Sequence, residues 1–405
     1  MKYYVHTLGC KFNQYESAQI DKLLRYSGNV RSKPEDADII VINSCAVTQE
    51  ASRKSLQVAR HFQKVNLNSK IIFTGCVVHD RKVDDFTLIL GNGEKLRISD
   101  FIDKTGLFSD PIYHLKDDLK YTIEKMPNHT RAFLGIENGC NWGCSYCAIP
   151  HFRGTRIRSK PLRTVIKEIH EMIRSGVKEI VLTGINIALY KDGNVDLHDL
   201  VESILELEFD FRLRLGSLDP LSAANLSDLF ENPKLCHHIH LSMQSGSDDV
   251  LKRMNRHYNS QDILKVVKIF KNMDNKFAFS TDVIVGFPGE TEKDFRETCD
   301  LLKKMQVSRI HVFPFSAKPH TLASTMKGQI KEEIKKKRVK ILKSLAQELS
   351  KNYLKKLEGT LQRILVERTK NDMVEGLDQY YVRHKIKCEA KEGNFVECKI
   401  EGVYS

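Results

Sequence analysis

Three cysteines of one short loop give the strongest chemical signal in the chain. Cys140, Cys144 and Cys147 lie in ENGCNWGCSYCAIP with C-x3-C-x2-C spacing. Three thiolates on one loop can hold three irons of a cubane [4Fe–4S] cluster, and the fourth iron is then open to chelate a small molecule. A Cys3His zinc site completed by His151 is an alternative, although the loop lacks the paired C-x2-C units of most zinc motifs. Buried core cysteines are a second alternative.

Cys10, Cys45 and Cys76 form a second candidate metal site. Each ends a strand-like run, in YYVHTLGC, ADIIVINSC and SKIIFTGC. The carboxyl ends of neighbouring parallel strands lie together at one edge of a sheet, so these thiols could meet in space. Three unrelated buried cysteines are the alternative. The remaining four of the ten cysteines have no partner at metal spacing, and we expect them to be packing residues.

The elements that position these cysteines follow from hydrophobic periodicity. Strand-like and helical runs alternate through residues 1–110, which predicts a parallel α/β domain. The alternation resumes after a linker at 111–129, and residues 130–356 form the next domain. Its expected strands are 132–137, 179–183, 212–216, 238–242, 279–285 and 309–314. Six strands rather than eight predict a partly open (β/α)6 barrel, with active-site residues on the loops that follow the strands.

The last part of the chain changes pattern. Residues 326–357 are predicted to form a long basic helix whose KKKR run at 335–338 is solvated. Its expected buried stripe consists of Ile330, Ile334, Ile341, Leu342, Leu345 and Leu349. Residues 357–405 are predicted to form a small antiparallel β-barrel, with KEGN at 391–394 as a hairpin turn.

The net charge indicates the kind of partner, and the hydrophobic pattern indicates the location. Lys and Arg total 64 against 52 Asp and Glu, which gives a net charge of +12 and favours a polyanion such as nucleic acid. No apolar run approaches the roughly 18–20 residues that span a bilayer. The N-terminus also lacks the apolar core of a signal peptide. We therefore expect a cytoplasmic protein with no membrane partner, in which the cysteines stay reduced.

The cysteine loop resembles the signature of the radical S-adenosylmethionine (SAM) superfamily. That resemblance implies an open iron that binds the amino and carboxylate groups of SAM, whose cleavage by one electron yields a 5′-deoxyadenosyl radical. It also implies a partial six-strand barrel. Tyr146, the aromatic residue before the third cysteine, is expected near the adenine.

HTLGCKFNQYES, INSCAVT and TGC look like the cluster motifs of the methylthiotransferase family within that superfamily. Its members join an N-terminal domain with a second [4Fe–4S] cluster to a radical SAM barrel and a C-terminal TRAM barrel, and the match covers essentially the whole chain. The resemblance implies that Cys10, Cys45 and Cys76 bind this auxiliary cluster, whose open iron holds the sulfur to be transferred. Asn13 and Asn43 accompany them.

Further family-like segments imply the surroundings of SAM. VLTGIN, QSGS and TDVIVGFPGET follow the second, fourth and fifth strands, with Ile185 in place of a family Gln. After the sixth strand, Phe315–Ser316 and His320–Thr321 depart from the family pattern. Ordinary turns and surface charges remain alternatives at each single position. The cofactor-binding residues carried over are Tyr146, Gly184, Asn186, Gln244, Ser245, Arg256, Asp282 and Gly286.

Basic residues near the cysteine loop and in the tail are candidates for RNA contact. Arginines that follow the loop can hold phosphate, although bracing of the loop is an equal alternative. The small barrel predicted for residues 357–405 is of the OB-like type that binds RNA. The candidates are Arg153, Arg156, Arg158, Arg363, Arg368 and Lys385.

The opening HTLGCKFNQYE most resembles family members that act on threonylcarbamoyl-adenosine in tRNA. The isopentenyl type has a GCQMN-like segment and the ribosomal-protein type a GCPKN-like one. We therefore expect methylthiolation of adenine C2 beside the anticodon, at position 37. Modification of isopentenyl-adenosine or of a ribosomal-protein aspartate is the alternative within the family. A non-catalytic iron–sulfur RNA-binding sensor is the alternative from another class.

The resemblance also implies the cofactors and partners. The cofactors are two [4Fe–4S] clusters and SAM. The partners are tRNA, an electron donor of the flavodoxin or ferredoxin type, and a sulfur donor. No side chain is an obvious general base, so no catalytic residue is expected beyond those that hold the cofactors.

Overall fold

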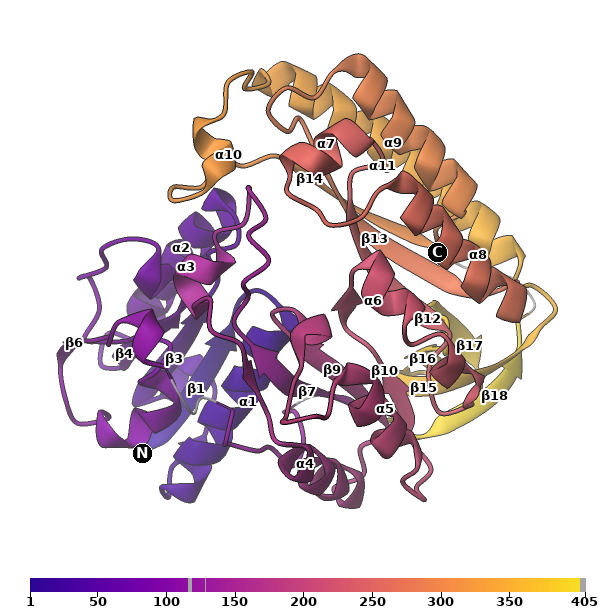
Figure 1. Ribbon diagram of the computed structural model, residues 1–405. Helices are drawn as coiled ribbons and strands as arrows, with labels where there is room; N and C mark the ends of the chain where they lie inside the picture. Colours follow the sequence, from indigo (N-terminus) through magenta and orange to yellow (C-terminus); the bar gives the residue numbers. More distant parts are fainter. Residues whose placement is uncertain (116–118, 128, 401–405) are drawn as a thin grey trace.

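A fully parallel sheet opens the chain (Figure 1). The computed structural model describes residues 1–115, 119–127 and 129–400. The sheet order is β2-β1-β3-β4-β5-β6. The strands are β1 (Lys2–Thr7), β2 (Val30–Arg31), β3 (Ile39–Ser44), β4 (Lys70–Gly75), β5 (Leu88–Leu90) and β6 (Gly106–Phe108). β3 is buried throughout, as expected for a parallel strand that is covered on both faces.

Two helices cover the faces of this sheet. Ile39 and Val41 pack with α1 (Lys11–Tyr26), whereas Ile40 and Ile42 pack with α2 (Gln49–Val65). The predicted α/β domain is therefore present, but its first strand is shorter than expected. It ends at Thr7, and Cys10 is the N-cap of α1 instead of a strand residue.

The barrel has the six predicted strand positions, divided between two four-stranded sheets in the orders β10-β9-β7-β8 and β11-β12-β13-β14. They are β7 (Arg131–Asn138), β9 (Glu179–Gly184), β10 (Arg212–Arg214) continued by β11 (Ser217–Leu218), β12 (His238–Gln244), β13 (Ala278–Val285) and β14 (Arg309–Pro314). These strands pair in parallel, and the short β8 (Arg158–Ser159) adds antiparallel to the end of β7. Within the described residues no pairing joins β14 back to β7, so the barrel is open on that side.

Helices surround the barrel. They are α3 (Ile149–Arg153), α4 (Leu162–Arg174), α5 (Leu197–Leu205), α6 (Pro220–Ala224), α7 (Asp248–Arg253), α8 (Ser260–Met273), α9 (Glu292–Met305), α10 (Leu322–Thr325) and α11 (Glu332–Lys355). Short 3-10 turns connect elements throughout: η1 (Pro34–Asp36), η2 (Cys76–His79), η3 (Lys95–Asp100), η4 (Ile112–His114), η5 (Ile187–Leu189) and η6 (Asp228–Glu231). No helix of the described part is long and apolar enough to cross a membrane.

The long basic helix is shorter than predicted, and its buried stripe agrees in part, because Leu342, Leu345 and Leu349 are buried as expected. Ile334 and Ile341, expected in its buried stripe, are 40% and 42% exposed, and α11 begins only at Glu332. The KKKR run is not wholly solvated, because Lys335 and Arg338 are buried. Lys335 donates to the Phe315 carbonyl at 3.2 Å, and Arg338 forms an ion pair with Glu290 at 3.0 Å. These polar partners at the barrel end turn the charged face of α11 inward.

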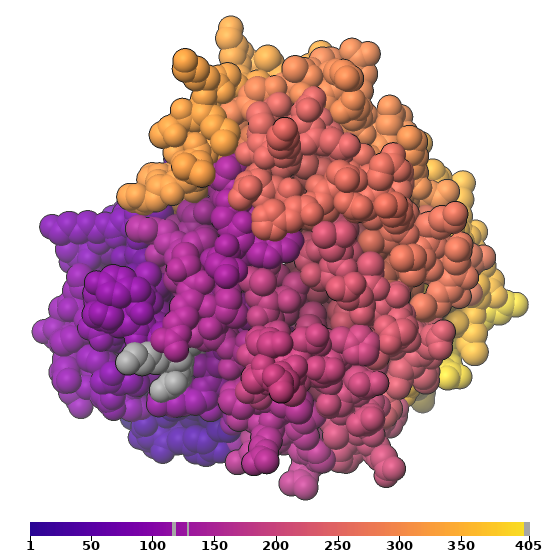
Figure 2. Space-filling model, viewed as in Figure 1, coloured from indigo at the N-terminus to yellow at the C-terminus, as the bar shows by residue number. Residues whose placement is uncertain are grey.

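The open side of the barrel lies against the N-terminal domain. α1 runs beside β7 (Figure 1), and a Cβ added to Gly135 would lie 2.5 Å from the Tyr15 ring. Tyr15 donates to the Glu168 carboxylate of α4 at 2.9 Å, and Lys160 forms a buried ion pair with the same carboxylate. Figure 2 shows the atoms of the two regions in continuous contact. The two domains are thus joined by buried polar contacts.

The C-terminal sheet is antiparallel, in the order β17-β16-β15-β18, and forms a half-barrel. Its strands are β15 (Leu361–Lys370), β16 (Met373–Leu377), β17 (Arg383–Lys387) and β18 (Phe395–Lys399). The turn expected at 391–394 is present, since the Asn394 amide donates to the Lys391 carbonyl at 3.2 Å, but the hairpin is wrong, because β17 and β18 lie at opposite edges. The tight hairpin joins β15 to β16 through Asn371 and Asp372, whose φ angles are 48° and 59°. Asn and Asp tolerate the left-handed backbone that such a turn requires.

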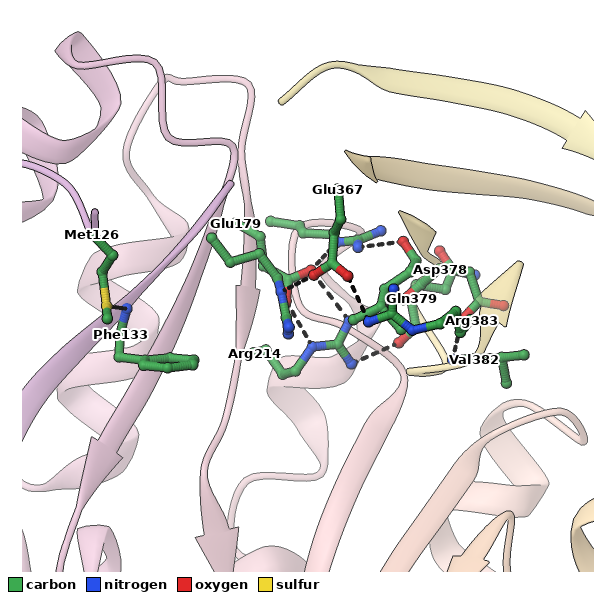
Figure 3. Close-up of polar contacts among 12 residues, drawn as sticks. Met126, Phe133, Glu179, Arg214, Glu367, Asp378, Gln379, Val382 and Arg383 are labelled. Atoms are coloured by element: carbon green, nitrogen blue, oxygen red, sulfur yellow. Dashed lines mark hydrogen bonds and ion pairs between the residues drawn. The ribbon is translucent and has the colours of Figure 1, made fainter. Parts of the chain in front are cut away.

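The C-terminal sheet docks at the amino ends of the barrel strands (Figure 3). Glu179, at the start of β9, is fully buried and forms ion pairs with Arg212 at 2.5 Å and Arg214 at 3.0 Å. Arg214 also donates to the Asp378 carbonyl at 2.9 Å. Arg131 joins Glu179 to Glu367 of β15. The tail is therefore attached to the barrel by a buried charged network.

Asp274 adds a titratable contact at this interface, since it accepts a hydrogen bond from Tyr380 at 2.9 Å and bonds His237 at 2.8 Å. Burial raises the pKa of Asp274, but its hydrogen bonds, led by that of His237, outweigh burial and lower the pKa from 3.8 to about 2. A depressed pKa stabilises the fold above the unfolded pKa, and the contribution is lost as the pH falls toward 2.

We therefore expect Asp274→Asn to lower the free energy of unfolding most near neutral pH. The difference from the wild type should shrink as the pH falls from 3.8 toward 2. Chemical denaturation of both proteins across this range measures it. A difference that stays constant over the whole pH range would show that the Asp274 charge contributes nothing.

Candidate functional site

The three N-terminal cysteines come together at one edge of the parallel sheet. Cys10 caps α1, Cys45 follows β3, and Cys76 begins η2 directly after β4. Cys45 and Cys76 are buried, whereas Cys10 is exposed. Burial raises the pKa of the Cys45 thiol to about 12, and the nearby thiols of Cys76 and Cys10 add to this shift. The three cysteines were predicted to meet because each follows a strand, and they do lie together in the fold.

Two glycines permit this close approach. Gly9 has φ +99°, and a Cβ there would lie 2.7 Å from the Cys45 sulfur. Gly75 has φ +94°, and a Cβ there would lie 2.5 Å from the Ser44 carbonyl oxygen. Both the backbone conformation and the lack of space exclude other residues. These glycines explain why small residues precede Cys10 and Cys76.

Asn13 and Asn43 hold the cysteine loops in place. Asn13 donates from its side-chain amide to the Leu8 and Ser44 carbonyls, each at 2.9 Å, and so ties the Cys10 loop to the Cys45 loop. Asn43 donates to the Asn13 carbonyl at 2.9 Å. Both residues therefore act as braces between strands and helix.

The charge around this trio suits an anionic group. Glu16 on α1 is buried between Arg153 and Lys95, at 2.5 Å and 2.6 Å. Two cations on one carboxylate leave one positive charge in excess. The Cys76 and Cys10 thiols are among the groups that raise the pKa of Arg153, although burial opposes its charge. Three neighbouring cysteines, which glycines allow to approach closely, and a nearby guanidinium fit an iron–sulfur cluster, which carries negative charge.

Gly75→Ala should disrupt this site. The strained backbone costs about 1–3 kcal/mol, and the added methyl would displace Ser44, so iron bound at the N-terminal site should fall by at least half. Iron analysis of the purified protein measures the loss. Gly28→Ala is the matched control, because Gly28 has φ +79° but nothing within 4 Å of an added Cβ. Equal iron contents in the two variants would contradict the steric argument.

The barrel cysteine loop is held by residues that follow β12. Asn255 donates to the Gly143 carbonyl at 3.0 Å, and the Ser145 amide donates to the Met254 carbonyl at 3.1 Å. Cys140, Cys144 and Cys147 are all half-buried. Burial raises the pKa of Cys147 to about 12, and the Cys144 and Cys140 thiols add to the shift. The loop thus gathers its three sulfurs at the carboxyl end of β7.

Arg256 and Asn186 contact these sulfurs directly. Arg256 donates from Nη1 to the Cys144 sulfur at 3.1 Å, and its guanidinium lies 4.7 Å from the Trp142 ring centroid. Burial raises the pKa of Cys140, and a hydrogen bond from Asn186 lowers it. The backbone N–H of Asn186 donates to the buried Glu137 carboxylate at 2.7 Å. Two residues expected near SAM therefore lie at the cysteine loop.

The other residues expected near SAM are distributed over the strand ends. Gly184 lies against Glu137, where a Cβ would be 2.9 Å from the carboxylate. Gln244 ends β12 with φ 66°. Tyr146 packs in an apolar cluster with Phe287 and Phe315. Their proximity to a bound ligand remains a prediction.

Three of the expected SAM contacts already have partners within the protein. The Ser245 hydroxyl lies 3.3 Å from that of Thr298 on α9, which turns it away from the strand ends. Asp282 lies 3.3 Å from His240 and 3.9 Å from His311. The Gly286 amide is bound by Glu290. A role of Ser245 and Asp282 at SAM therefore stays a prediction.

The arginines after the loop are mostly not available to RNA. Arg153 is 1% exposed and donates to Asn13 at 2.6 Å and to Glu16. Arg158 is also buried and donates to the Arg156 and Arg153 carbonyls at 2.9 Å and 3.0 Å. Arg156 alone is exposed. The bracing role, which the sequence left open, therefore holds for Arg153 and Arg158.

The three RNA-contact candidates of the C-terminal domain differ in their exposure to solvent. Arg363 forms an ion pair with Asp210 at 2.6 Å and stacks on Phe395 at 3.8 Å. Arg368 and Lys385 are exposed and flank Glu375 from opposite sides. Only the latter two are presented to solvent as RNA contacts would require.

The two cysteine sites lie close together because α3 connects them. It begins two residues after Cys147 and ends at Arg153, which lies beside Cys10 and Cys76. Five helical residues span about 7.5 Å. Lys318, on the loop after β14, forms a buried ion pair with Asp80 at 2.7 Å and fixes the barrel to the N-terminal domain on the other side. The roles of Glu137 and Lys318 and the closeness of the two sites were not predicted from the sequence.

Neither cysteine trio is as compact in this structure as the ligand set of one zinc ion. Two sulfurs bound to one zinc at about 2.3 Å are at most about 4.6 Å apart. In the described part of the chain, the ligand set compact enough for one ion is His198, Asp199 and Glu202 on the surface, and neither cysteine trio meets that criterion. His151 instead stacks on His320, with centroids 4.4 Å apart. In a [4Fe–4S] cluster each cysteine binds a different iron, so the sulfurs lie farther apart than they do around one zinc ion.

Comparison with known proteins connects both halves of the site. Residues 136–302 match the Radical SAM superfamily, and residues 2–88 match the Uncharacterized protein family UPF0004. The threonylcarbamoyladenosine tRNA methylthiotransferase MtaB of Thermotoga maritima is 39% identical over 94% of this chain and 90% of its own length. The MtaB of Bacillus subtilis is 33% identical over 98% and 92%.

Other relatives are named for a different substrate. The tRNA-2-methylthio-N(6)-dimethylallyladenosine synthase of Clostridium botulinum is 33% identical over 92% of this chain and 87% of its own length. Among solved structures, the radical SAM methyltransferase TsrM of Kitasatospora setae, with cobalamin and a [4Fe–4S] cluster bound, has a TM-score of 0.59 at 13% identity. The match covers 80% of this chain and 76% of that one. This likeness shows the fold alone.

Proposed function

This chain belongs to the family of radical SAM tRNA methylthiotransferases, and from this premise we propose that it methylthiolates C2 of N6-threonylcarbamoyladenosine at position 37 of tRNA. The observation that carries the proposal is the convergence of two cysteine trios joined by α3. Two relatives that are 39% and 34% identical to this chain are named for this substrate and support the choice of nucleoside.

The two trios would hold two [4Fe–4S] clusters, and Cys140, Cys144 and Cys147 would hold the one that binds SAM. When bound, these groups supply the one-electron cleavage of SAM and the sulfur transfer. The residues of the chain position them. Arg256 orients the Cys144 thiolate by a charge-assisted hydrogen bond. Arg153 places a buried positive charge beside the N-terminal trio.

The proposal includes partners and location. Exposed Arg156, Arg368 and Lys385 would contact tRNA phosphates, since they have no buried structural role. An electron donor of the flavodoxin or ferredoxin type and a sulfur donor complete the cycle in the cytoplasm. The domains are 1–110, a linker at 111–129, the barrel at 130–356 and the TRAM domain at 357–405.

Nucleoside mass spectrometry of bulk tRNA, from cells with and without the gene, tests the proposal. We expect 2-methylthio-threonylcarbamoyladenosine to disappear while its precursor accumulates. Loss of the isopentenyl counterpart instead would favour the substrate type of the Clostridium botulinum relative. No change in either nucleoside would contradict a tRNA substrate of these two types.

A further inference from the structure

The interior of the half-open barrel is polar. Ile239, Leu241 and Phe279 face outward, where they join the apolar cluster of the surrounding helices. Strand alternation therefore turns His238, His240, Ser280 and Asp282 inward, together with His311 of the next strand. The contacts agree, because both histidines of β12 lie 2.9 Å from the Ser280 hydroxyl. A packed barrel core would be apolar at these positions.

The floor of this interior comes from the C-terminal domain. Tyr381, with φ 66°, places its ring 4.9 Å from the His238 ring and 4.8 Å from the Arg214 guanidinium. Arg131 lies 5.7 Å from the same ring. The floor therefore combines an aromatic face with two guanidinium groups.

Lys11 enters this interior from the N-terminal domain through the open side. Its ammonium lies 5.8 Å from the centroid of the Tyr381 ring. Within the described residues Lys11 has no carboxylate partner, because Asp282 is bound by His240, and Glu179 and Glu367 are bound by arginines.

The interior therefore has excess positive charge. Lys11, Arg131, Arg212 and Arg214 bring four positive charges, whereas the carboxylates of Glu179, Glu367 and Asp282 bring three negative ones, and Lys11 forms no ion pair within the described residues. A half-buried ammonium without a partner is costly, and an anionic ligand would remove that cost. Because Lys11 directly follows Cys10, this charge lies next to the N-terminal cysteine site.

We infer that the barrel interior binds the carboxylate of the substrate side chain, with Lys11 as its charge partner. The inference rests on the proposed function, since the threonylcarbamoyl group carries a carboxylate and the isopentenyl group carries none. The histidine-lined wall and Tyr381 would supply polar partners for the rest of that side chain. Lys11 is thus a specificity residue and not one that takes part in the chemistry.

Lys11→Met keeps the length of the side chain and removes its charge. With the reconstituted holoenzyme we expect the Kd for an anticodon stem-loop that carries threonylcarbamoyladenosine to rise roughly 10- to 100-fold, the range for a lost charge-assisted hydrogen bond. The Kd for the same stem-loop with unmodified adenosine should stay within about 2-fold. Lys11→Arg should restore most of the loss, and Lys64→Met, an exposed lysine of α2, should change neither.

Three results would overturn the inference. Equal weakening of both stem-loops would assign Lys11 to a backbone phosphate. No weakening of either would leave it as a packing residue on Tyr381. A wild-type enzyme that binds the methyl ester of the threonylcarbamoyl stem-loop as tightly as the free acid would also exclude a carboxylate site, even where Lys11→Met loses iron. A failure of the proposed function gives a different result, because the wild-type enzyme would then form no methylthio product from the threonylcarbamoyl stem-loop.

Discussion

Cys76→Ala should abolish methylthiolation while cleavage of SAM continues, whereas Cys144→Ala should abolish both. The two residues lie on different elements, after β4 and after β7, and each belongs to its own trio. Loss of one ligand should therefore remove one site only, and iron should fall from about eight to about four per chain in each variant. Anaerobic assays of 5′-deoxyadenosine and of modified nucleoside, with iron analysis, separate the two effects.

Cys299→Ala is the matched control, because this half-buried cysteine of α9 lies outside both trios. It should keep full iron and both activities. Persistent cleavage of SAM in Cys144→Ala would remove the barrel loop from its assigned role. Wild-type methylthiolation by Cys76→Ala would do the same for the N-terminal trio.

Glu179→Gln should lower the free energy of unfolding by about 3–5 kcal/mol, the usual cost of breaking a buried ion pair from one side. Burial opposes ionisation of this carboxyl, yet Arg212, Arg214 and Arg131 hold its pKa well below the ordinary value. Without the carboxylate, three guanidinium groups remain close together in the interface (Figure 3).

The same substitution should loosen the C-terminal sheet, because Arg214 links Glu179 to the Asp378 and Gln379 carbonyls. Chemical denaturation measures the loss of stability, and limited proteolysis should release the tail more quickly. Glu333→Gln on the exposed face of α11 is the control and should change stability by less than about 0.5 kcal/mol. A loss for Glu179→Gln as small as that of the control would mean that the network contributes no net stability.

Local patterns predicted much of the fold and the core of the site. The six barrel strands follow from short hydrophobic runs, and the barrel trio follows from spacing within one loop. The N-terminal trio was predicted because each cysteine follows a strand, and parallel strands align their carboxyl ends. The KEGN hairpin was wrong because a turn sequence reports local conformation, whereas the partner of β18 is the distant β15.

Only the tertiary structure decided which charged side chains are buried. For Arg153 the sequence left phosphate contact and bracing of the loop equally open, and the side chain is buried because Glu16 and Asn13, 137 and 140 residues away, accept hydrogen bonds from its guanidinium. Lys335 and Arg338 were expected in solvent and pack against the barrel. Lys11 gave no signal of its own, and it faces the barrel interior only because α1 covers the open side. Hydrophobic period and ligand spacing are short-range properties that a sequence displays, whereas burial of a charge depends on a partner that folding alone brings near.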